Sequence, residues 1–508
     1  MLGTTLVLLA SSALVAAAPY ATNQTRESCN FLFRHYPESV HFPGSLRYAR
    51  EDTFSWSTDS WLGPACVFTP YSTPMVTAGI QLLAARDVPF AIRGGGFMPI
   101  ANAANIGPEG ILFSNSNMTL LTIEDDKSVV HVGAGVTFGP LYDFVAPHNV
   151  AINGVRLGNV GVVGFHLGGG IGFFSYEHGV APTTVKSFDV VLANGTATTV
   201  SNSSSADLFW ALRGGGNNFA YVTSVSLYTI PSESIVLGDV GYGTERADQY
   251  YESMTDFALH AGADPASSTE GQSRWQPARN PNVSYHAFLF NSANKFDAPG
   301  FANLTAPKLP FTSGNLTKTT MSGWFKRFEA HPDFDNRKRF LFYSIPADKA
   351  AFKIATDAYY RVLREEKLDE VRGFFTAFSV MPITSKVVEA SAANGGNPTG
   401  LTASSVPALW LVESPSWDDG VDDAHVDAAH VKANAAIKDD LKAAGFDMLP
   451  FIYLSDAALD QPVFEGYGQE SWDKLKSIAK IYDPTEVFQR LVPGAPKISA
   501  DRGQARRG

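Results

Sequence analysis

Residues 89–97 read PFAIRGGGF, in which a short apolar run is followed by an arginine, three glycines and a phenylalanine. An apolar run that stops at consecutive glycines predicts a strand leading into a tight loop. Glycine has no side chain and reaches positive φ, so the backbone of this loop can approach a ligand closely. Its N–H groups, with Arg93 beside them, would form an anion site suited to a pyrophosphate. An ordinary glycine turn is the alternative interpretation.

Two more glycine clusters follow, GGGIG at 168–172 and GGGNNF at 214–219, each next to β-rich or aromatic sequence. Three such loops suggest one extended ligand lying across them. Helical spacing predicts a helix over Met75–Arg86, before the first strand, whereas the segment after the first glycines contains a proline and is not typical of a helix. A Rossmann fingerprint needs its glycine loop to open a helix, so this order argues against a nicotinamide dehydrogenase.

Elsewhere the hydrophobic pattern predicts an α/β arrangement with longer helices after Pro231. Helices are expected over Phe138–Val145, Leu208–Leu212, Arg246–His260 and Asp348–Leu363. Strands are expected over 128–132, 221–228, 285–290, 374–380 and 408–412, with a hairpin at Asn194-Gly195. The second half lacks phosphate-type glycine loops, which indicates a second α+β domain that covers the ligand.

Five motifs occur in a fixed order: IRGGG (92–96), VHVGAGVTFGPLYDFV (130–145), GVVGFHLGGGIGFFSYEHG (161–179), DLFWALRGGGNNFAYVTSVSL (207–227) and YGQESWDKLKSIAKIYDPTEVF (467–488). Together they resemble the FAD-binding domain of the vanillyl-alcohol-oxidase type (PCMH type), specifically the fungal berberine-bridge-enzyme-like oxidases. The resemblance extends from about Cys66 to Phe488, nearly the whole mature chain.

The resemblance implies an α+β fold in which a two-part PCMH-type FAD-binding domain is joined to a second α+β substrate domain. The expected boundaries are 19–231 for the FAD-binding domain and 232–447 for the substrate domain. A berberine-bridge-like C-terminal segment, 448–495, is expected to return to the FAD domain and complete it. We expect residues 496–508, with their basic end, to form a disordered tail.

The same resemblance implies which residues contact FAD. They are Arg93, Gly94, Gly95, Gly96, Phe97, Leu157, Gly158, Gly161, Gly164, His166, Gly168, Gly169, Gly170, Gly172, Val222 and Tyr453. Two of these positions depart from the family pattern. Phe97 stands where a histidine is usually bonded to the flavin, and Leu157 stands where many members have a second, cysteine link. Neither side chain can attack the flavin ring, so we expect FAD to be bound non-covalently.

The sequence offers few candidate catalytic residues. Tyr453, at a position often held by asparagine, and His166, within the second glycine motif, are candidate catalytic residues, although a core aromatic and a structural histidine are the alternatives. The family's active-site carboxylate has no counterpart at Thr402–Ser405. Glu389, Glu413 and Glu465 remain as acidic candidates without geometric support.

The resemblance implies an FAD-linked oxidoreductase, an oxidase or dehydrogenase that acts on a small organic molecule, with molecular oxygen as a candidate electron acceptor. The implied setting is fungal secondary-metabolite biosynthesis. A redox-neutral isomerase or cyclase with a structural flavin is the first alternative. A glycoprotein with a decayed flavin site is the second, and the intact glycines at all three loops argue against it.

The N-terminus predicts a secretory route. Residues 1–18 contain the apolar run LVLLASSALVAAA before small residues and read as a cleaved signal peptide, although the segment before the run lacks a lysine or arginine. Secretion or residence in the secretory lumen is therefore expected. Seven glycosylation sequons agree with this route, at Asn23, Asn117, Asn194, Asn202, Asn282, Asn303 and Asn315.

The composition indicates which kinds of binding partner to expect. The chain has 508 residues, a formal net charge of −11, and 45% hydrophobic and 18% charged residues, which is typical of a globular protein and argues against a nucleic-acid partner. No second long apolar segment predicts a membrane span. In an oxidising compartment the two cysteines, Cys29 and Cys66, are expected to form a disulfide, which the family also commonly has near here; two unrelated buried thiols are the alternative. The histidines show no metal-binding spacing, and His425 and His430 are expected on a solvated helix. The sequence does not indicate an oligomeric state.

Overall fold

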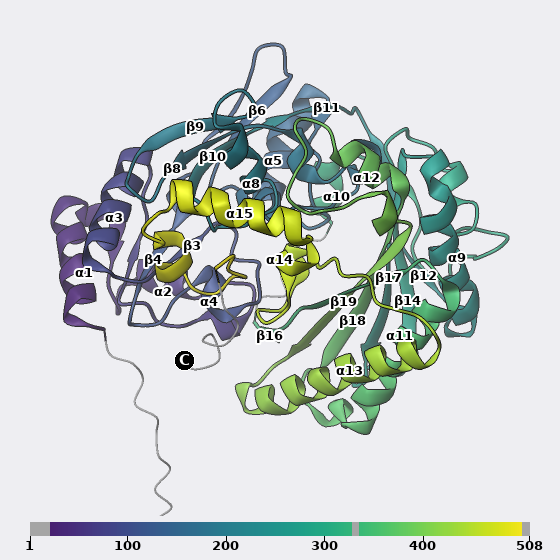
Figure 1. Cartoon of the computed structure of the whole chain (residues 1–508). Coiled ribbons are helices and arrows are strands. Elements are labelled where there is room, and N and C mark those ends of the chain that lie inside the picture. The colour runs from purple at the N-terminus through teal and green to yellow at the C-terminus, as the bar shows by residue number, and fades with distance from the viewer. Residues whose placement is uncertain (1–20, 328–334, 500–508) are drawn as a thin grey trace, which may run out of the picture.

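The computed structural model describes residues 21–327 and 335–499, so the expected signal peptide lies outside the described residues. The chain forms an α+β structure in which two sheets of the N-terminal part lie beside one large sheet of the second part (Figure 1). The fold class predicted from the sequence is confirmed. Within the described residues, no helix is both long and apolar enough to cross a membrane.

The first sheet has four strands in the order β1-β2-β4-β3. Strands β2 (Cys66–Phe68) and β3 (Phe90–Arg93) both run parallel to β4 (Ile111–Ser114), and β1 (Val40–His41) is antiparallel. Helices α1 (Asn23–His35) and α3 (Thr73–Arg86) pack beside it. A disulfide joins Cys29 of α1 to Cys66 of β2, with Cα atoms 6.1 Å apart, which confirms the predicted pairing.

The second sheet is antiparallel, with five strands in the order β5-β6-β10-β8-β9. Its strands are β5 (Leu121–Ile123), β6 (Val129–Gly133), β8 (Val185–Val191), β9 (Ala197–Ser201) and β10 (Tyr221–Tyr228). Helices α5 (Phe138–Val145), α6 (Val162–Leu167) and α8 (Ala206–Leu212) belong to the same core. A two-stranded pair, β7 (Val150–Ala151) and β11 (Ile230–Pro231), leads out of this part.

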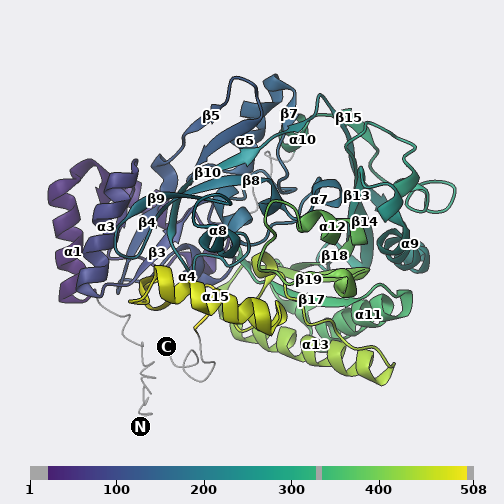
Figure 2. The same cartoon turned by 45° about the horizontal axis from the view of Figure 1, so that its top comes forward.

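The second part is built on an eight-stranded antiparallel sheet in the order β15-β12-β14-β13-β18-β19-β16, with β17 also paired to β19. Its long strands are β12 (Ile235–Tyr242), β13 (Ser267–Gln276), β14 (Asn280–Asn291), β17 (Leu341–Pro346), β18 (Phe375–Ile383) and β19 (Ala408–Trp417), and its short ones are β15 (Thr317–Thr319) and β16 (Arg337–Lys338). Helices α9 (Ala247–His260), α11 (Lys349–Glu365) and α13 (Asp423–Ala443) cover one face (Figures 1 and 2).

The other face of the large sheet meets the N-terminal part. Phe173 stacks on Phe290 of β14 with ring centroids 4.9 Å apart. The Tyr176 hydroxyl, in α7 (Ser175–His178), donates to the carbonyl oxygens of Thr269 (3.2 Å) and Pro382 (2.7 Å). Two short helices, α10 (Met321–Phe325) and α12 (Ser385–Ser391), lie at the same junction (Figure 2).

The chain ends by returning to its beginning. Helices α14 (Val463–Gly466) and α15 (Gln469–Tyr482), then a π-helical turn at Val487–Leu491, lie across the N-terminal part (Figure 1). The Tyr482 hydroxyl donates to Asp207 (2.8 Å), and Phe488 packs in the core that holds the disulfide. The packing continues to Ile498, which is 2% exposed, so residues 496–499 differ from the disordered tail expected there. The rest of that expected tail, 500–508, lies outside the described residues.

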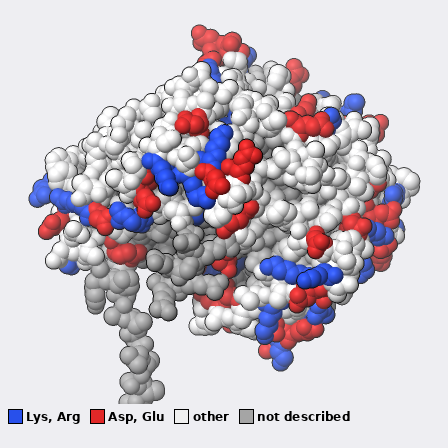
Figure 3. Space-filling view, in the orientation of Figure 1, with Lys and Arg blue, Asp and Glu red and all other residues white. Residues whose placement is uncertain are grey.

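The outer surface carries charged side chains of both signs. On the face seen in Figure 3, Lys and Arg side chains lie among Asp and Glu side chains, and the described residues drawn there show no large area of one sign. Some of these surface charges form ion pairs, such as Lys349 with Asp248 (2.7 Å). On this face the negative charges are therefore not gathered in one patch.

Most elements predicted from periodicity are confirmed, including Phe138–Val145 and Tyr221–Tyr228 with identical bounds. Two expectations need correction. The strands expected over 285–290, 374–380 and 408–412 are longer, at Asn280–Asn291, Phe375–Ile383 and Ala408–Trp417, and belong to one sheet. His430 is 7% exposed rather than solvated, because α13 packs this side chain against β19.

Candidate functional site

The three glycine loops meet at one cavity of about 250 Å³, which we name the glycine-loop cavity. Segments from four regions of the sequence form its walls: 92–98, 155–171, 216–222 and 453–456, with Ala495 and Pro496 closing one end. Ten of the residues predicted to contact FAD line it: Arg93, Gly94, Gly95, Gly96, Phe97, Gly161, Gly164, Gly168, Val222 and Tyr453.

The first loop follows β3 directly and is packed against the second. A Cβ atom on Gly95 would lie 2.3 Å from the backbone nitrogen of Gly161, a distance that no side chain tolerates. Gly96 adopts φ +67°, which favours glycine. The N–H groups of Gly95 and Gly96 donate no hydrogen bond to any described group. The loop therefore offers bare N–H donors to the cavity, as an anion site requires.

Arg93 differs from the expected role of an anion-binding charge. Its guanidinium is 1% exposed and pairs with the carboxylate and the carbonyl oxygen of Glu51, and it donates to the Ser114 hydroxyl (2.9 Å). The paired carboxylate largely neutralises the charge of a buried arginine, so the arginine attracts a ligand anion only weakly. Arg93 therefore fixes the start of the glycine loop, and the backbone supplies the donors.

The second glycine cluster divides into two roles. Gly161 and Gly168, at the two ends of α6, line the cavity. Gly170 and Gly172 instead allow close packing, since a Cβ on Gly172 would lie 1.9 Å from the Gly154 carbonyl oxygen. Outside the cavity lining lie six residues predicted to contact FAD: Leu157, Gly158, His166, Gly169, Gly170 and Gly172.

His166 is a buried packing residue in this structure. Its ring lies between Phe138 and Phe165, with centroids 6.2 and 5.7 Å away. Its Nδ1 contacts the Val162 carbonyl oxygen at 2.8 Å, and burial lowers its pKa to about 4. His166 does not line the glycine-loop cavity, which favours the structural alternative over the catalytic one.

The third loop contributes an amide-rich wall. Gly216, Asn217 and Asn218 line the cavity. The Asn218 side chain is fully buried and donates to the carbonyl oxygens of Gly215 (2.8 Å) and Pro496 (3.1 Å). This amide joins the third loop to the end of the described chain.

The two positions at which the resemblance places covalent flavin links lie in different surroundings. Phe97 lines the cavity and stacks on Trp56, with ring centroids 4.2 Å apart and planes 11° from parallel. Leu157 is 42% exposed and does not line the cavity. Neither position holds a nucleophile, as its residue type already requires.

Ionisable side chains also line the glycine-loop cavity. Arg156 and Asp456 both line the cavity, and Arg156 pairs with Glu270 of β13 (2.7 Å). Burial raises the pKa of Asp456 to about 7, which Arg156 opposes and Glu270 reinforces. Asp456 can therefore exchange a proton near neutral pH.

Tyr453 lies in the same wall, and its hydroxyl oxygen accepts from the Ile171 N–H (3.0 Å). Burial raises its pKa, so the phenol stays protonated and serves as a donor rather than a base.

Sequence reasoning missed Arg156 and Asp456 as site residues. Both stand next to residues that the resemblance singled out, Asp456 three residues after Tyr453 and Arg156 beside Leu157. The acidic candidates that were named lie elsewhere: Glu389 is exposed and pairs with Lys386 (2.6 Å), and Glu413 is buried on the helix-covered face of the sheet. Glu465 also lies outside the cavity lining.

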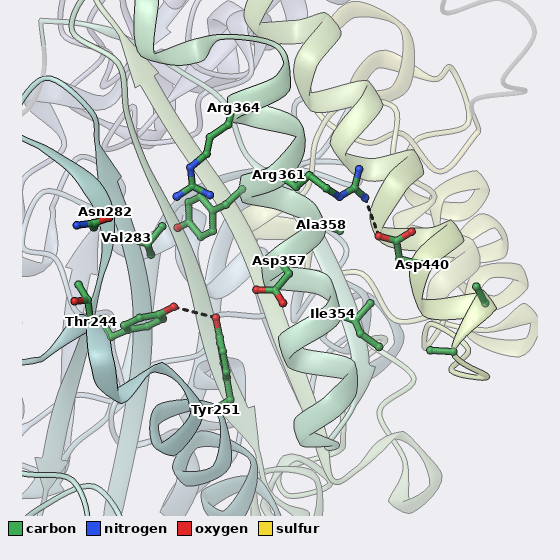
Figure 4. Close-up of a pocket in the computed structure, with 14 residues that line it drawn as sticks. Thr244, Tyr251, Asn282, Val283, Ile354, Asp357, Ala358, Arg361, Arg364 and Asp440 are labelled. Carbon is green, nitrogen blue, oxygen red and sulfur yellow. Dashed lines mark hydrogen bonds and ion pairs between the residues drawn. The ribbon is translucent and has the colours of Figure 1, made fainter.

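A larger hollow of about 900 Å³ opens on the outer side of α11, away from the glycine loops (Figure 4). Its polar groups engage one another: Arg361 pairs with Asp440 (2.8 Å), and the hydroxyls of Tyr251 and Tyr285 lie 3.1 Å apart. No group of three or more metal-ligating side chains occurs within the described ranges. The glycine-loop cavity is therefore the stronger candidate.

Comparison with known proteins agrees with this choice. Residues 64–201 match the family model described as FAD binding domain. The FAD-dependent monooxygenase prx3 of Penicillium roqueforti is 29% identical over 496 residues, which cover 96% of each chain. The chain therefore contains a region similar to FAD-binding domains and is similar along nearly its whole length to an FAD-dependent monooxygenase. Its glycine-loop cavity lies partly within the matched FAD-binding region.

Solved structures of two sugar oxidases have the same fold as this chain. The xylooligosaccharide oxidase of Myceliophthora thermophila aligns with a TM-score of 0.72 at 20% identity, over 92% of this chain and 99% of that one. The glucooligosaccharide oxidase of Acremonium strictum gives the same TM-score, identity and coverage. That enzyme contains a 6-S-cysteinyl, 8α-N1-histidyl FAD, a flavin linked through both a cysteine and a histidine.

Proposed function

We propose that this protein is an FAD-dependent oxidoreductase that binds FAD non-covalently and oxidises a small organic molecule. The observation that carries the proposal is the convergence of three glycine loops and the Tyr453–Asp456 segment on one cavity. Glycines that permit backbone contact on one wall and a proton-exchanging carboxylate on another are the two parts that a flavin oxidoreductase requires.

The glycine loops would hold the cofactor. The free N–H groups of Gly95 and Gly96 suit pyrophosphate oxygens, and the wall from Gly216 to Asn218 offers amide groups for further polar contacts. FAD bound there would supply the acceptor for a hydride from a substrate C–H bond, with an acceptor such as molecular oxygen taking up the electrons.

Side chains of the protein would accept the proton that the substrate loses. Asp456, with a pKa raised to about 7, takes the proton of a substrate O–H or N–H group as the adjacent C–H bond is oxidised. The Arg156–Glu270 pair (2.7 Å) fixes the guanidinium beside this carboxylate and stabilises its ionised form. Tyr453 remains protonated and orients the substrate oxygen by donating a hydrogen bond.

Non-covalent binding follows from Phe97 and Leu157, which occupy the two positions that the family uses for covalent links. The glucooligosaccharide oxidase, by contrast, has both a cysteinyl and a histidyl link to its flavin. Loss of both links lowers the oxidising power that the family gains from them, so the substrate is an easily oxidised one. Relatives at 28–29% identity include fungal FAD-dependent monooxygenases, which supports a substrate from fungal secondary metabolism.

We also propose that the protein enters the secretory pathway. Six of the seven sequon asparagines are exposed, and Asn303 is half-buried with its amide nitrogen hydrogen-bonded to Asp256. The disulfide between Cys29 and Cys66 suits an oxidising compartment. Secreted material that loses mass on treatment with an N-glycosidase supports this route, and exclusive recovery from the cytosol contradicts it.

The deciding experiment is the spectrum and turnover of the purified protein. We expect flavin absorbance bands, release of all flavin into the supernatant on acid precipitation, and peroxide or an equivalent reduced acceptor with substrate. A flavin-free protein that does not take up added FAD would contradict the proposal. A redox-neutral isomerase or cyclase is the second candidate, and product formation without acceptor reduction identifies it.

A further inference from the structure

The last described residues, 494–499, cross the third glycine loop, and we name them the C-terminal strap. Gly494 allows a close approach, because a Cβ atom there would lie 1.9 Å from the carbonyl carbon of Asn102. Ala495 and Pro496 line the glycine-loop cavity, and Lys497 follows them directly in the sequence. The strap therefore brings a lysine to a loop, GGGNNF at 214–219, that has no charged residue of its own.

The amino group of Lys497 contacts two oxygen atoms. Its Nζ donates to Oδ1 of Asn217 (3.1 Å) and to the carbonyl oxygen of Phe488 (3.1 Å). An amino group has two N–H bonds when neutral and three when charged, so it can donate to both oxygens in either protonation state. The atom of the Asn217 carboxamide that faces Lys497 is therefore the oxygen.

This contact determines what Asn217 offers to the cavity. Asn217 is half-buried and lines the glycine-loop cavity, and its Nδ2 group has no partner among the described residues. The carboxamide of Asn218 is engaged on both sides, since Oδ1 accepts from Gln489 (3.0 Å) and Nδ2 donates to two carbonyl oxygens. The Nδ2 group of Asn217 is therefore a donor left for a ligand.

The cationic side chains that line the cavity are already paired. Arg93 forms an ion pair with Glu51, and Arg156 forms one with Glu270 (2.7 Å). Lys497, by contrast, forms no ion pair with any residue in the described ranges. An anion at this end of the cavity would therefore interact most favourably with the charge of Lys497, which lies directly behind the Asn217 carboxamide.

The turn packed against Lys497 carries three charged residues, Asp483, Glu486 and Arg490. Arg490 pairs with Asp87 (2.5 Å), and Glu486 is exposed. Burial lowers the pKa of Lys497 to about 7, and the charge of Asp483 opposes this shift. An anion bound nearby would favour the charged form of Lys497, so binding of the anion would be accompanied by uptake of a proton above pH 7.

We propose that Lys497 is a positioning residue of the FAD site, which orients the Asn217 carboxamide so that its Nδ2 group donates to the pyrophosphate of the cofactor. The inference rests on the proposed function, because its ligand is FAD. The pyrophosphate is the part of FAD that carries negative charge, and it is therefore the part that a lysine behind the amide stabilises.

The test titrates FAD into apoprotein prepared from the purified holoprotein and follows the quenching of flavin fluorescence. Lys497→Met keeps the length of the side chain but removes its charge and donors, and should raise the Kd for FAD at least tenfold. Lys497→Arg restores both and should stay within threefold of the wild type. Lys476→Met is the control, because Lys476 pairs with Asp473 (2.7 Å) on α15 outside the cavity, and should bind FAD as the wild type does.

A second variant, Asn217→Ala, leaves the lysine in place and tests the same contact from the other side. It should also raise the Kd at least tenfold, and adding Lys497→Met should raise it less than threefold further, because Lys497 acts through Asn217. Between pH 7 and 9 the Kd should rise in the wild type and in Asp456→Asn, and should rise less in Lys497→Met. Thermal melts of the apoproteins show whether each variant is folded.

Four results would overturn the inference: wild-type affinity in Lys497→Met, equally weak binding in Lys497→Arg, effects of Lys497→Met and Asn217→Ala that simply add, or an unchanged pH dependence in Lys497→Met. The failure of the proposed function looks different. Wild-type apoprotein that takes up no FAD rejects the proposed function, whereas uptake that Lys497→Met does not weaken rejects this inference alone.

Discussion

The ring of Phe97, in the wall of the glycine-loop cavity, stacks on Trp56 with centroids 4.2 Å apart. An aromatic pair in this geometry stabilises by about 0.5–1.5 kcal/mol beyond its buried area. The stack therefore orders the end of the first glycine loop.

Replacing Phe97 by histidine should restore part of the family's chemistry. We expect wild-type protein to release all its flavin on denaturation, and Phe97→His to retain a measurable fraction on the polypeptide, because the imidazole supplies a nucleophile. In-gel flavin fluorescence after denaturation measures this. Phe97→Leu, which also breaks the stack on Trp56, is the matched control and should show no attachment. A fluorescent wild-type band would contradict the inference from residue type.

Gly95 and Gly161 allow a second, independent test of the cavity. Gly95→Ala places a Cβ 2.3 Å from the Gly161 nitrogen, so the two loops must separate. Overpacking of this kind costs about 1–3 kcal/mol, and we expect FAD affinity to fall at least tenfold. Gly262→Ala, whose Cβ meets nothing closer than 3.6 Å, is the control and should bind FAD normally. Equal flavin content in both variants would show that the loops do not form the FAD site.

Asp456 should set the acid limb of the pH profile. A base with a pKa of about 7 must lose its proton to act, so kcat/KM should rise with pH through about 7 and then level off. Asp456→Asn should remove this limb and lower kcat by two to four orders of magnitude, roughly the contribution of general base catalysis. A variant that keeps both the limb and the rate assigns the proton transfer to another group.

The Asp456 carboxylate should also make the stability of the protein depend on pH, and stability should fall as pH rises whereas kcat/KM rises. Its folded pKa lies above the usual value of 3.8, so the folded state binds more protons than the unfolded state between about pH 4 and 7. Its contribution to the free energy of unfolding therefore falls as pH rises through this window. In thermal melts of the apoprotein, Asp456→Asn should raise Tm relative to wild type at pH 8 and change it little at pH 4. A larger gain at pH 4 than at pH 8 would reverse the assigned direction of the shift.

The disulfide should stabilise the N-terminal part substantially. Cys29 and Cys66 are 37 residues apart, and in the chain-entropy model a loop of this length contributes about 4 kcal/mol. The double variant Cys29→Ala/Cys66→Ala should lower the midpoint of denaturant unfolding. Because the variant cannot be reduced further, adding dithiothreitol should lower the midpoint of the wild type only. An unchanged wild-type midpoint in reductant would show that the link does not support the fold.

Local elements and glycine loops were predictable because they depend on patterns within a few residues. Phe138–Val145 and Tyr221–Tyr228 follow from hydrophobic spacing alone. The pairing of Arg156 with Glu270, by contrast, joins residues from different parts of the fold, and no local pattern brings them together. The prediction for His430 was wrong for the same reason, because its burial depends on Glu413, which reaches it from a strand of the sheet.

The walls of the glycine-loop cavity are formed by segments far apart in the sequence. They extend from Ile92 in the first sheet to Pro496 beside the last described residues. At about 5–20 residues per second, a ribosome needs roughly 20–80 s to make the roughly 400 residues between these two segments. The cavity is therefore incomplete throughout this interval, and cofactor uptake follows synthesis. For a secreted chain, FAD must then be captured in the compartment where the protein finishes folding, and shortening the chain before Tyr453 should abolish capture even when both larger sheets are present.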